Sequence, residues 1–300
     1  MESKTLEGIR GGALMAKKQS REASHAWRHI FIWGMILFAL FPIYVVITSS
    51  LNNSGGLSTS SLIPKKISFD NYRSLFNDDS IPFMRWILNS IILASLNAVI
   101  SVMVGIAAAF AFSRLKFKGR KLSLQALLLV QVFPSFLALA AIYVIMERIY
   151  NVFPSIGLGT MWGLLLVYLG GSMGANAWLL KGFLDSIPAD LDEAAKIDGA
   201  SSVQIFWLIF LPLSVPILIV TTLLSFIGTF NEFVLASLFL QEVNERTVAV
   251  GLQSFVGSNF GANWGAFAAG SVVASVPLVA LFLSLQKYVV SGVTAGSVKG

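Results

Sequence analysis

Side chains that could do acid–base, nucleophilic or metal chemistry are scarce in this sequence. The chain has two histidines, His25 and His29, both before the first apolar stretch, and it has no cysteine. The lack of cysteine excludes a disulfide framework, thiolate-ligated zinc and iron–sulfur clusters. There is also no H-E-x-x-H pair for zinc and no Walker A loop for nucleotide phosphates. We therefore expect no catalytic residue, no bound cofactor and no metal site in this chain.

One acidic residue, Glu232, lies directly after a long stretch without charged residues. A carboxylate inside a membrane is costly and often functional, as an ion ligand or a proton relay. Three interpretations are open for Glu232. It lies at the outer membrane interface, it faces a substrate pathway or a subunit contact, or it relays protons.

The composition of the chain indicates the environment in which these residues lie. Of the 300 residues 56% are hydrophobic and 12% are charged, and the mean hydropathy is +0.77. Soluble domains have about 25% charged residues, so these charges are too few to cover a soluble fold of this size. A coiled coil, a disordered chain and a nucleic-acid module are excluded as well, despite the net charge of +6. The sequence predicts an all-α integral membrane protein.

Six long stretches of the chain contain no Asp, Glu, Lys or Arg. A helix of about 20 apolar residues crosses the roughly 30 Å of bilayer hydrocarbon, because each residue rises about 1.5 Å. The sequence therefore predicts six transmembrane helices in one domain, 30–286. We place these helices near residues 30–50, 88–112, 123–146, 160–180, 205–229 and 266–286.

Lysine and arginine lie mainly on the side of the N-terminus. That side holds fifteen: six in 1–29, five in 114–121, two in 181–198 and two in 287–300. The other side holds six: four in 51–85, one in 147–158 and one in 242–264. Because cytoplasmic segments are enriched in these residues, both termini are predicted in the cytoplasm. The leader 1–29 is long for a signal peptide, and no clear cleavage site follows the first apolar stretch. We therefore expect the first span to be retained.

The cytoplasmic loop 181–204 is polar but has the pattern of a folded unit. Pro188 suits a first helical turn, and the acids that follow favour a helix N-terminus; they are Asp190, Asp192 and Glu193. Gly199 is a natural helix stop, and Ser201-Ser-Val-Gln204 resembles a capping box that opens a second helix. Helical spacing places Leu191, Ala194 and Ala195 on one face. Taken alone, this pattern also suits a helix that lies on the membrane surface.

The same loop contains a specific spacing of residues. Glu193-Ala194-Ala195 is followed by three residues and Gly199, then by nine residues and Ile209-Phe-Leu211-Pro212. This pattern resembles the EAA loop of ABC importer permeases, which have the type I importer permease fold. In that family the loop forms a coupling helix that sits in a cleft of the cytoplasmic ATPase. The resemblance implies an ATPase contact at Glu193, Ala194, Ala195, Gly199, Ile209, Leu211 and Pro212.

The resemblance extends over nearly the whole chain and points to the sugar permeases of this family. The stretches that carry it are Ser61-Leu-Ile-Pro64, Gln131-Val-Phe-Pro134, Tyr168-Leu-Gly-Gly171, Leu211-Pro-Leu-Ser-Val-Pro216 and Ala249-Val-Gly-Leu-Gln253. The tail 287–300 resembles the family's cytoplasmic tail, which implies an ATPase contact at Gly292, Thr294, Gly296 and Lys299. The outer loop 241–264 resembles a loop that enters the cleft of a binding protein. There Gln253, Ser254 and Phe255 occupy the position of a polar–aromatic stretch, whereas Val256-Gly-Ser258 departs from the family pattern.

The resemblance implies a non-catalytic permease subunit that moves maltose or maltodextrin by alternating access across the bacterial cytoplasmic membrane. The implied partners are a sister permease subunit in a heterodimer, two copies of a cytoplasmic ABC ATPase that hydrolyses ATP with magnesium, a maltose/maltodextrin-binding protein outside the membrane, and the lipid bilayer. No nucleic acid is implied. One alternative is a permease for another oligosaccharide or for glycerol phosphate. A secondary transporter, which would need no ATPase, is an alternative of a different class.

Overall fold

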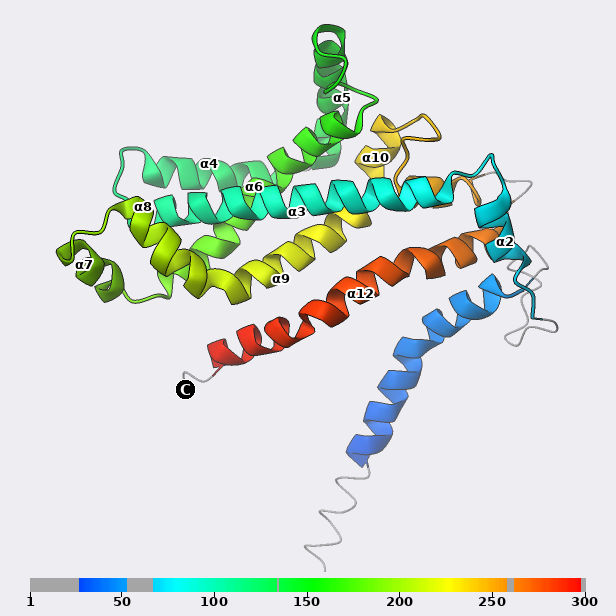
Figure 1. Ribbon diagram of the computed structural model, residues 1–300, viewed down its shortest axis with the longest axis horizontal. Helices are drawn as coiled ribbons and strands as arrows, with labels where there is room; N and C mark the ends of the chain where they lie inside the picture. Colours follow the sequence, from blue (N-terminus) through cyan, green and yellow to red (C-terminus); the bar gives the residue numbers. More distant parts are fainter. Residues whose placement is uncertain (1–26, 53–66, 134, 258–261, 298–300) are drawn as a thin grey trace, which may run out of the picture.

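The computed structural model describes residues 27–52, 67–133, 135–257 and 262–297 (Figure 1). The regular structure of these ranges is helical. The first helix, Trp27–Ser50, is followed by α2 (Asp70–Asn77), α3 (Phe83–Arg114), α4 (Arg120–Val132), α5 (Ser135–Val152), α6 (Met161–Asp185), α7 (Asp190–Ile197), α8 (Ser202–Ile205), a π-helical turn (Phe206–Phe210), α9 (Leu211–Phe230), α10 (Val234–Phe239), α11 (Val248–Gln253) and α12 (Trp264–Ser297). The predicted all-α fold is confirmed for the described residues.

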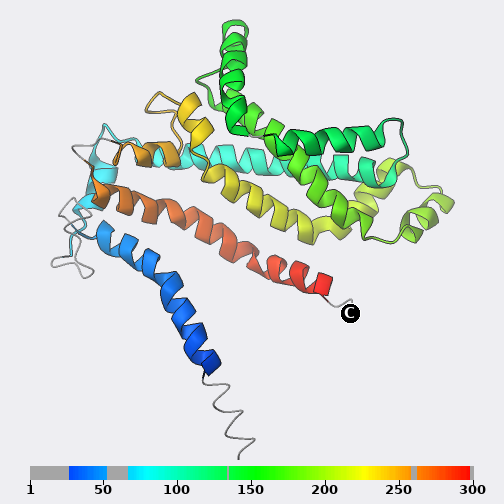
Figure 2. The same ribbon diagram turned by 180° about the vertical axis from the view of Figure 1, so that it is seen from behind.

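Helix α3 forms the centre of the bundle and packs along α6 and α9, while α12 covers α9 and reaches α2 (Figures 1 and 2). Close approach between α3 and α6 depends on Gly105. A Cβ atom on this glycine would lie 2.9 Å from Cβ of Asn176. Helices in lipid associate through such close packing of small residues, because no hydrophobic effect drives them together.

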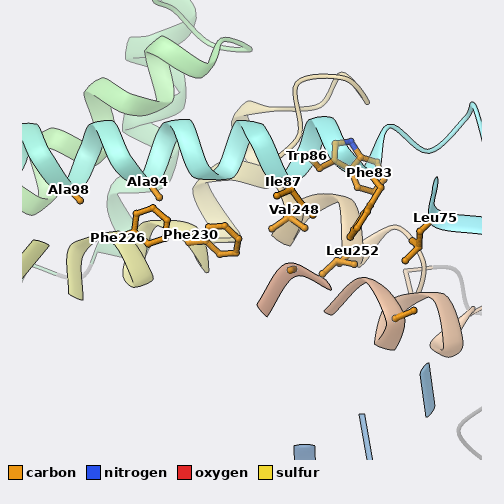
Figure 3. Close-up of a cluster of buried hydrophobic side chains, with 12 residues drawn as sticks. Leu75, Phe83, Trp86, Ile87, Ala94, Ala98, Phe226, Phe230, Val248 and Leu252 are labelled. Carbon is orange, nitrogen blue, oxygen red and sulfur yellow. The ribbon is translucent and has the colours of Figure 1, made fainter. Parts of the chain in front are cut away.

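The apolar core near α2 holds the helices and the outer loop together. Phe226 and Phe230 of α9 stack on each other, and they lie beside α3 between Ala94 and Ile87, as Figure 3 shows. Trp86 of α3 lies in the same cluster, and its indole Nε1 donates to the carbonyl of Val243 at 2.6 Å. This contact joins the chain after α10 to the first turn of α3.

The two ends of the bundle differ in charge and in the loops they hold. One end carries α7 and the α3–α4 loop, with the cations Arg114, Lys116, Lys118, Arg120, Lys121, Lys181 and Lys196. The opposite end carries α2, α10 and α11. Five described helices are long and apolar enough to cross a membrane, and six if α4 and α5 count as one span. The count agrees with the six predicted spans, and the cationic end is the predicted cytoplasmic side.

The third predicted span, 123–146, differs from the structure. Instead of one continuous helix, the chain forms α4 and α5, which are inclined to each other by 103°. Sequence position 134 is proline, and a residue before proline disfavours the helical backbone. Phe133 accordingly has an extended backbone, with φ −65° and ψ 128°. The 13 residues of α4 rise only about 20 Å, so α4 alone is too short to cross.

The two terminal helices differ from each other in packing. Helix Trp27–Ser50 lies apart from the bundle and exposes apolar side chains along its length (Figure 1). Its C-terminal end is held by Asn71, whose Nδ2 donates to the carbonyl of Ser50 at 2.9 Å. Helix α12 continues to Ser297, past the predicted end at 286. Residues 287–297 are therefore helical, whereas most of the leader lies outside the described residues.

Candidate functional site

Helix α7 stands outside the span bundle at its cationic end (Figure 1). Its first turn contains the acids Asp190, Asp192 and Glu193, and its last turn contains Lys196. Each charge opposes the partial charge of the nearer helix terminus, which stabilises a helix of only eight residues. The predicted short surface helix is therefore present, but it begins at Asp190 after the N-cap Ala189, so Pro188 precedes the helix and does not lie in its first turn as predicted.

The turn after α7 depends on Gly199, whose φ is +83°. Its N–H donates to the carbonyl of Lys196 at 3.1 Å, and the N–H of Ala200 donates to the carbonyl of Ala195 at 2.9 Å. These two bonds form a Schellman motif, in which the residue with positive φ is usually glycine. The predicted glycine stop is confirmed.

The predicted capping box follows this turn and is also confirmed. The N–H of Gln204 donates to Oγ of Ser201 at 3.3 Å, and the N–H of Ser201 donates to Oε1 of Gln204 at 2.8 Å. The paired bonds satisfy backbone donors at the start of α8. They fix the direction in which the chain leaves the glycine turn and enters the fifth span.

The motif residues on α7 point to opposite sides. Glu193 and Ala194 are exposed, together with Leu191, whereas Ala195 is half-buried against an apolar cluster. That cluster joins α3, α6 and the π-helical turn; its buried members are Val102, Ile106, Ala109, Phe110, Leu180, Leu184, Ile205 and Phe210. Helical spacing places Leu191, Ala194 and Ala195 on one side of α7, and of the three only Ala195, at the edge of that side, packs on the bundle.

The remaining motif residues lie where the loop joins the membrane span. Ile209 and Leu211 pack on the same apolar cluster as Ala195, and Pro212 is exposed. The N–H of Leu211 donates to the carbonyl of Phe206, five residues earlier. Pro212 has no N–H to continue an α-helix and its ring would crowd residue 208, and the wider turn lies directly before it. Such π-helical turns occur frequently at functional sites.

The buried residue of α7 is Asp192. From the sequence, this residue is expected only to favour the N-terminus of the helix by its charge. Asp192 is 6% exposed and pairs with Arg114 at the end of α3. The sequence contains one signal for this contact: Arg114 is the first charge after a long uncharged span. Pairing an arginine and an aspartate so far apart in the chain requires the fold.

At the opposite end of the bundle, the three residues predicted to form the polar–aromatic stretch of the outer loop differ in burial. Gln253 and Ser254 are exposed and line a cavity of about 450 Å³ with Arg246 and Phe233. Phe255 is half-buried, with its ring centroid 6.3 Å from that of Trp86. The aromatic member of the stretch therefore belongs to the core, and the two polar members face outward.

Other predicted residues are placed by α12 or lie outside the described ranges. Gly292, Thr294 and Gly296 are on the last turns of α12. Lys299, Ser258 and Ser61–Pro64 are not among the described residues.

Glu232 follows α9 and connects three helices. Its carboxylate accepts hydrogen bonds from the Tyr168 hydroxyl at 2.5 Å and from the N–H groups of Leu235 and Ala236 at 2.8 and 3.0 Å. It thereby anchors the start of α10 to α6. Glu232 also lines an open cavity of about 500 Å³ between α3, α6 and α9, to which Asn97, Ser172, Asn176, Ser225 and Thr229 contribute polar groups.

The structure also shows where a possible serine nucleophile and possible metal-ligating side chains lie. Gly170-Gly-Ser172-Met-Gly174 has the G-x-S-x-G spacing of a nucleophile turn. It lies inside α6, however, and the Ser172 hydroxyl donates to the Tyr168 carbonyl at 2.8 Å. Among the residues that the structure describes, no three His, Asp or Glu side chains are grouped as metal ligands.

Residues 101–295 match the family described as binding-protein-dependent transport system inner membrane component. The chain is also similar to the maltose/maltodextrin transport system permease protein MalG of three bacteria. It is 39% identical to that of Vibrio parahaemolyticus, 40% to that of Photorhabdus laumondii and 38% to that of Escherichia coli K12. These alignments cover 91%, 92% and 95% of this chain and 95%, 98% and 99% of the relatives.

Two solved structures share the fold at lower sequence identity. A bacterial ABC transporter involved in the import of the acidic polysaccharide alginate aligns with a TM-score of 0.74 at 22% identity, over 90% of this chain and 98% of the other. A bacterial alginate ABC transporter in complex with an alginate pentasaccharide-bound periplasmic protein aligns with a TM-score of 0.63 at 18% identity, over 86% and 93%. Both likenesses agree with the type I importer permease fold.

Proposed function

Because the chain belongs to the family of binding-protein-dependent transport system inner membrane components, we propose that it is the permease subunit of an ABC importer for maltose or maltodextrin. The observation that carries this proposal is the similarity to MalG over almost the full length of both proteins. It includes the cytoplasmic loop, the outer loop and the spans, so more than a generic membrane fold is shared. The subunit acts in the bacterial cytoplasmic membrane.

The ATPase drives the importer through its contact with α7. The exposed residues Glu193 and Ala194 are accessible to a cytoplasmic protein, and the small side chain of Ala194 permits close approach to the helix backbone. Leu191 and Ile197 add apolar surface, since 43% and 86% of each residue is exposed. Two copies of an ABC ATPase would bind the importer, one of them on this helix, and hydrolyse ATP with magnesium.

The sugar path lies between this chain and a sister (MalF-like) permease subunit. The polar groups of the cavity between α3, α6 and α9 support this arrangement. They include the carboxylate of Glu232, and ionisable groups within membrane spans typically face a bundle interior or a water-filled path and not lipid. The exposed apolar faces of helix Trp27–Ser50 and of α12 are available to lipid and to the sister subunit.

The binding protein docks on the end of the bundle opposite α7. Exposed Gln253 and Ser254 beside the cavity at α11 support a polar contact there. A loaded binding protein and ATP then favour the outward-open state, and hydrolysis returns the importer to the inward-open state. Each ligand shifts this equilibrium only through contacts that differ between the two states.

Substrate-stimulated ATP hydrolysis tests the proposal. The chain is reconstituted with its sister permease, the ATPase and the binding protein, with and without maltose. We expect stimulation that requires maltose, the binding protein and this subunit. A response to another sugar instead of maltose would overturn the substrate, and failure of the ATPase to associate would overturn the importer.

A further inference from the structure

A single side chain, Arg114, joins four elements at the α7 end of the bundle. Its Nη2 donates to the carbonyls of Leu184 and Ile187, at 2.8 and 2.6 Å, where α6 ends. Its Nη1 lies 3.4 Å from Oδ1 of Asp192 on α7. The guanidinium carbon stands 4.8 Å from the ring centroid of Phe210 in the π-helical turn. Arg114 itself is the last residue of α3.

The Arg114–Asp192 pair is more buried than the other ion pairs at this end, one of which joins the second carboxylate oxygen of Asp192 to Lys196 on the same helix at 3.2 Å. Only 11% of the Arg114 side chain and 9% of the Asp192 side chain are exposed. The nearby Asp185, which pairs with Lys181, is 43% exposed. Charges are removed from water only at considerable cost, which good geometry and further hydrogen bonds must offset. Arg114 donates two such bonds, to the carbonyls of Leu184 at the end of α6 and of Ile187 just after it.

Apolar packing alone attaches α7 weakly to the bundle. Of its eight residues only Asp192 is buried and only Ala195 is half-buried. The methyl group of Ala195 is a small contact, and it is supplemented by Ile187 and Ala200, which flank α7 and pack on the same cluster. The contact between Asp192 and Arg114 adds a second point of attachment on the same face. The two contacts together resist rotation of α7 more than either contact does alone.

We propose that Arg114 and Asp192 are positioning residues that make α7 move as one body with α3 and α6. This inference rests on the proposed function, in which the ATPase displaces α7. The ATPase contacts the exposed face with Glu193, and the pair on the opposite face transmits the displacement to the spans. Asp192 is thus required for coupling although it does not contact the ATPase.

The first experiment uses the complete importer with Asp192→Asn, which keeps the shape of the side chain and removes its charge. Coupling energies of this kind correspond to roughly 5- to 150-fold effects. We therefore expect about a tenfold loss of maltose-stimulated ATP hydrolysis, with unchanged co-purification of the ATPase. Asp192→Glu should restore stimulation. Asp185→Asn is the control, because it removes an exposed carboxylate from the same end, and it should change stimulation less than twofold.

The second measurement reports the position of α7 without relying on activity. The chain contains no cysteine, so with partner subunits whose cysteines are replaced, spin labels at Lys118→Cys and Asp198→Cys report only the separation of the α3–α4 loop from the end of α7. In the otherwise unchanged complex we expect a narrow distance distribution that is the same with and without ATP. Asp192→Asn should broaden it. If Asp192→Asn does not reach the membrane, Arg114→Lys serves instead, because lysine keeps the charge but not the guanidinium fork.

The outcomes separate this inference from the proposed function. If the unchanged importer responds to maltose and Asp192→Asn matches it in both measurements, the positioning role is overturned. It is also overturned if α7 and the α3–α4 loop change separation on ATP binding in the unchanged complex. If the ATPase does not bind the unchanged chain, the proposed function fails first. A broadened distribution with retained ATPase binding supports the inference.

Discussion

Replacing Gly199 tests whether the turn after α7 has to adopt the backbone seen in the structure. A Cβ atom at this position would meet no atom within 4 Å, so a side chain causes no steric overlap within this chain. The effect is therefore conformational, and it arises from the φ of +83°. A left-handed backbone costs a residue with a side chain roughly 1–2 kcal/mol. Asparagine tolerates this region better, and a β-branched residue tolerates it worst.

The conformational cost of a non-glycine residue at position 199 sets an upper limit on the loss of ATPase affinity. An energy of about 1–2 kcal/mol corresponds to a factor of about 5–30 in an equilibrium constant. If the strained turn relaxes in the free subunit, ATPase binding has to restore it, and the apparent affinity falls by up to that factor. We expect Gly199→Ala to weaken binding by about this factor, Gly199→Asn less and Gly199→Val more.

The assay is a titration of the purified ATPase onto the permease pair in lipid nanodiscs. The matched control is Gly182→Ala, because Gly182 lies in α6 at the same end, has no positive φ and has open space around its Cβ position. Alanine there favours the helix, so binding should be unchanged. Equal affinities of Gly199→Val and the unchanged chain would refute the reasoning. It would also be refuted if Gly199→Asn were as weak as Gly199→Val, because the order of the series follows from the backbone alone.

Four further changes test three other parts of the molecule. Glu193→Lys reverses a charge on the exposed face of α7, so insertion should be spared while ATPase co-purification weakens and maltose uptake is abolished; normal uptake would reject the coupling role. Deleting 292–300 removes the end of α12 and should disturb regulation of the ATPase more than assembly, as measured by basal hydrolysis and subunit yield; loss of the protein from the membrane would contradict this. Glu232→Gln and Tyr168→Phe should each lower the free energy of unfolding by about 1–3 kcal/mol, measured by thermal unfolding of the purified complex. The double variant should lose less than the sum, since both changes weaken the same contact.

The spans could be predicted from the sequence because hydropathy is a local property. The break between α4 and α5 could not be predicted in this way, since counting apolar residues takes no account of the backbone. Pro134 is the signal, because it restricts Phe133 to the extended conformation that the structure shows. In the same way, the turn after α7 was predictable because Gly199 and Ser201 act on their immediate neighbours.

The burial of individual side chains could not be predicted, because it depends on partners far away in the chain. Asp190, Asp192 and Glu193 are equivalent as helix-terminus charges, yet only Asp192 is buried. The difference comes from Arg114, which the fold places against one face of α7. Phe255 shows the same limit. Beside two polar residues an aromatic suits a binding loop, but in the structure it packs on Trp86.

The spacing of the motif describes how α7 is attached as well as what it presents. If the motif encoded only a docking surface, its specified residues would all be exposed. Ala195, Ile209 and Leu211 instead pack on the cluster that joins α3 and α6. Gly199 ends the helix one turn after Ala195, and Pro212 follows the wider turn that leads into α9. These residues place α7 at a set angle to the spans, so that Glu193 and Ala194 face outward while Asp192 meets Arg114. Under the proposed function, an ATPase that pulled on a loosely attached helix would move the helix alone, so attachment of α7 would be part of coupling.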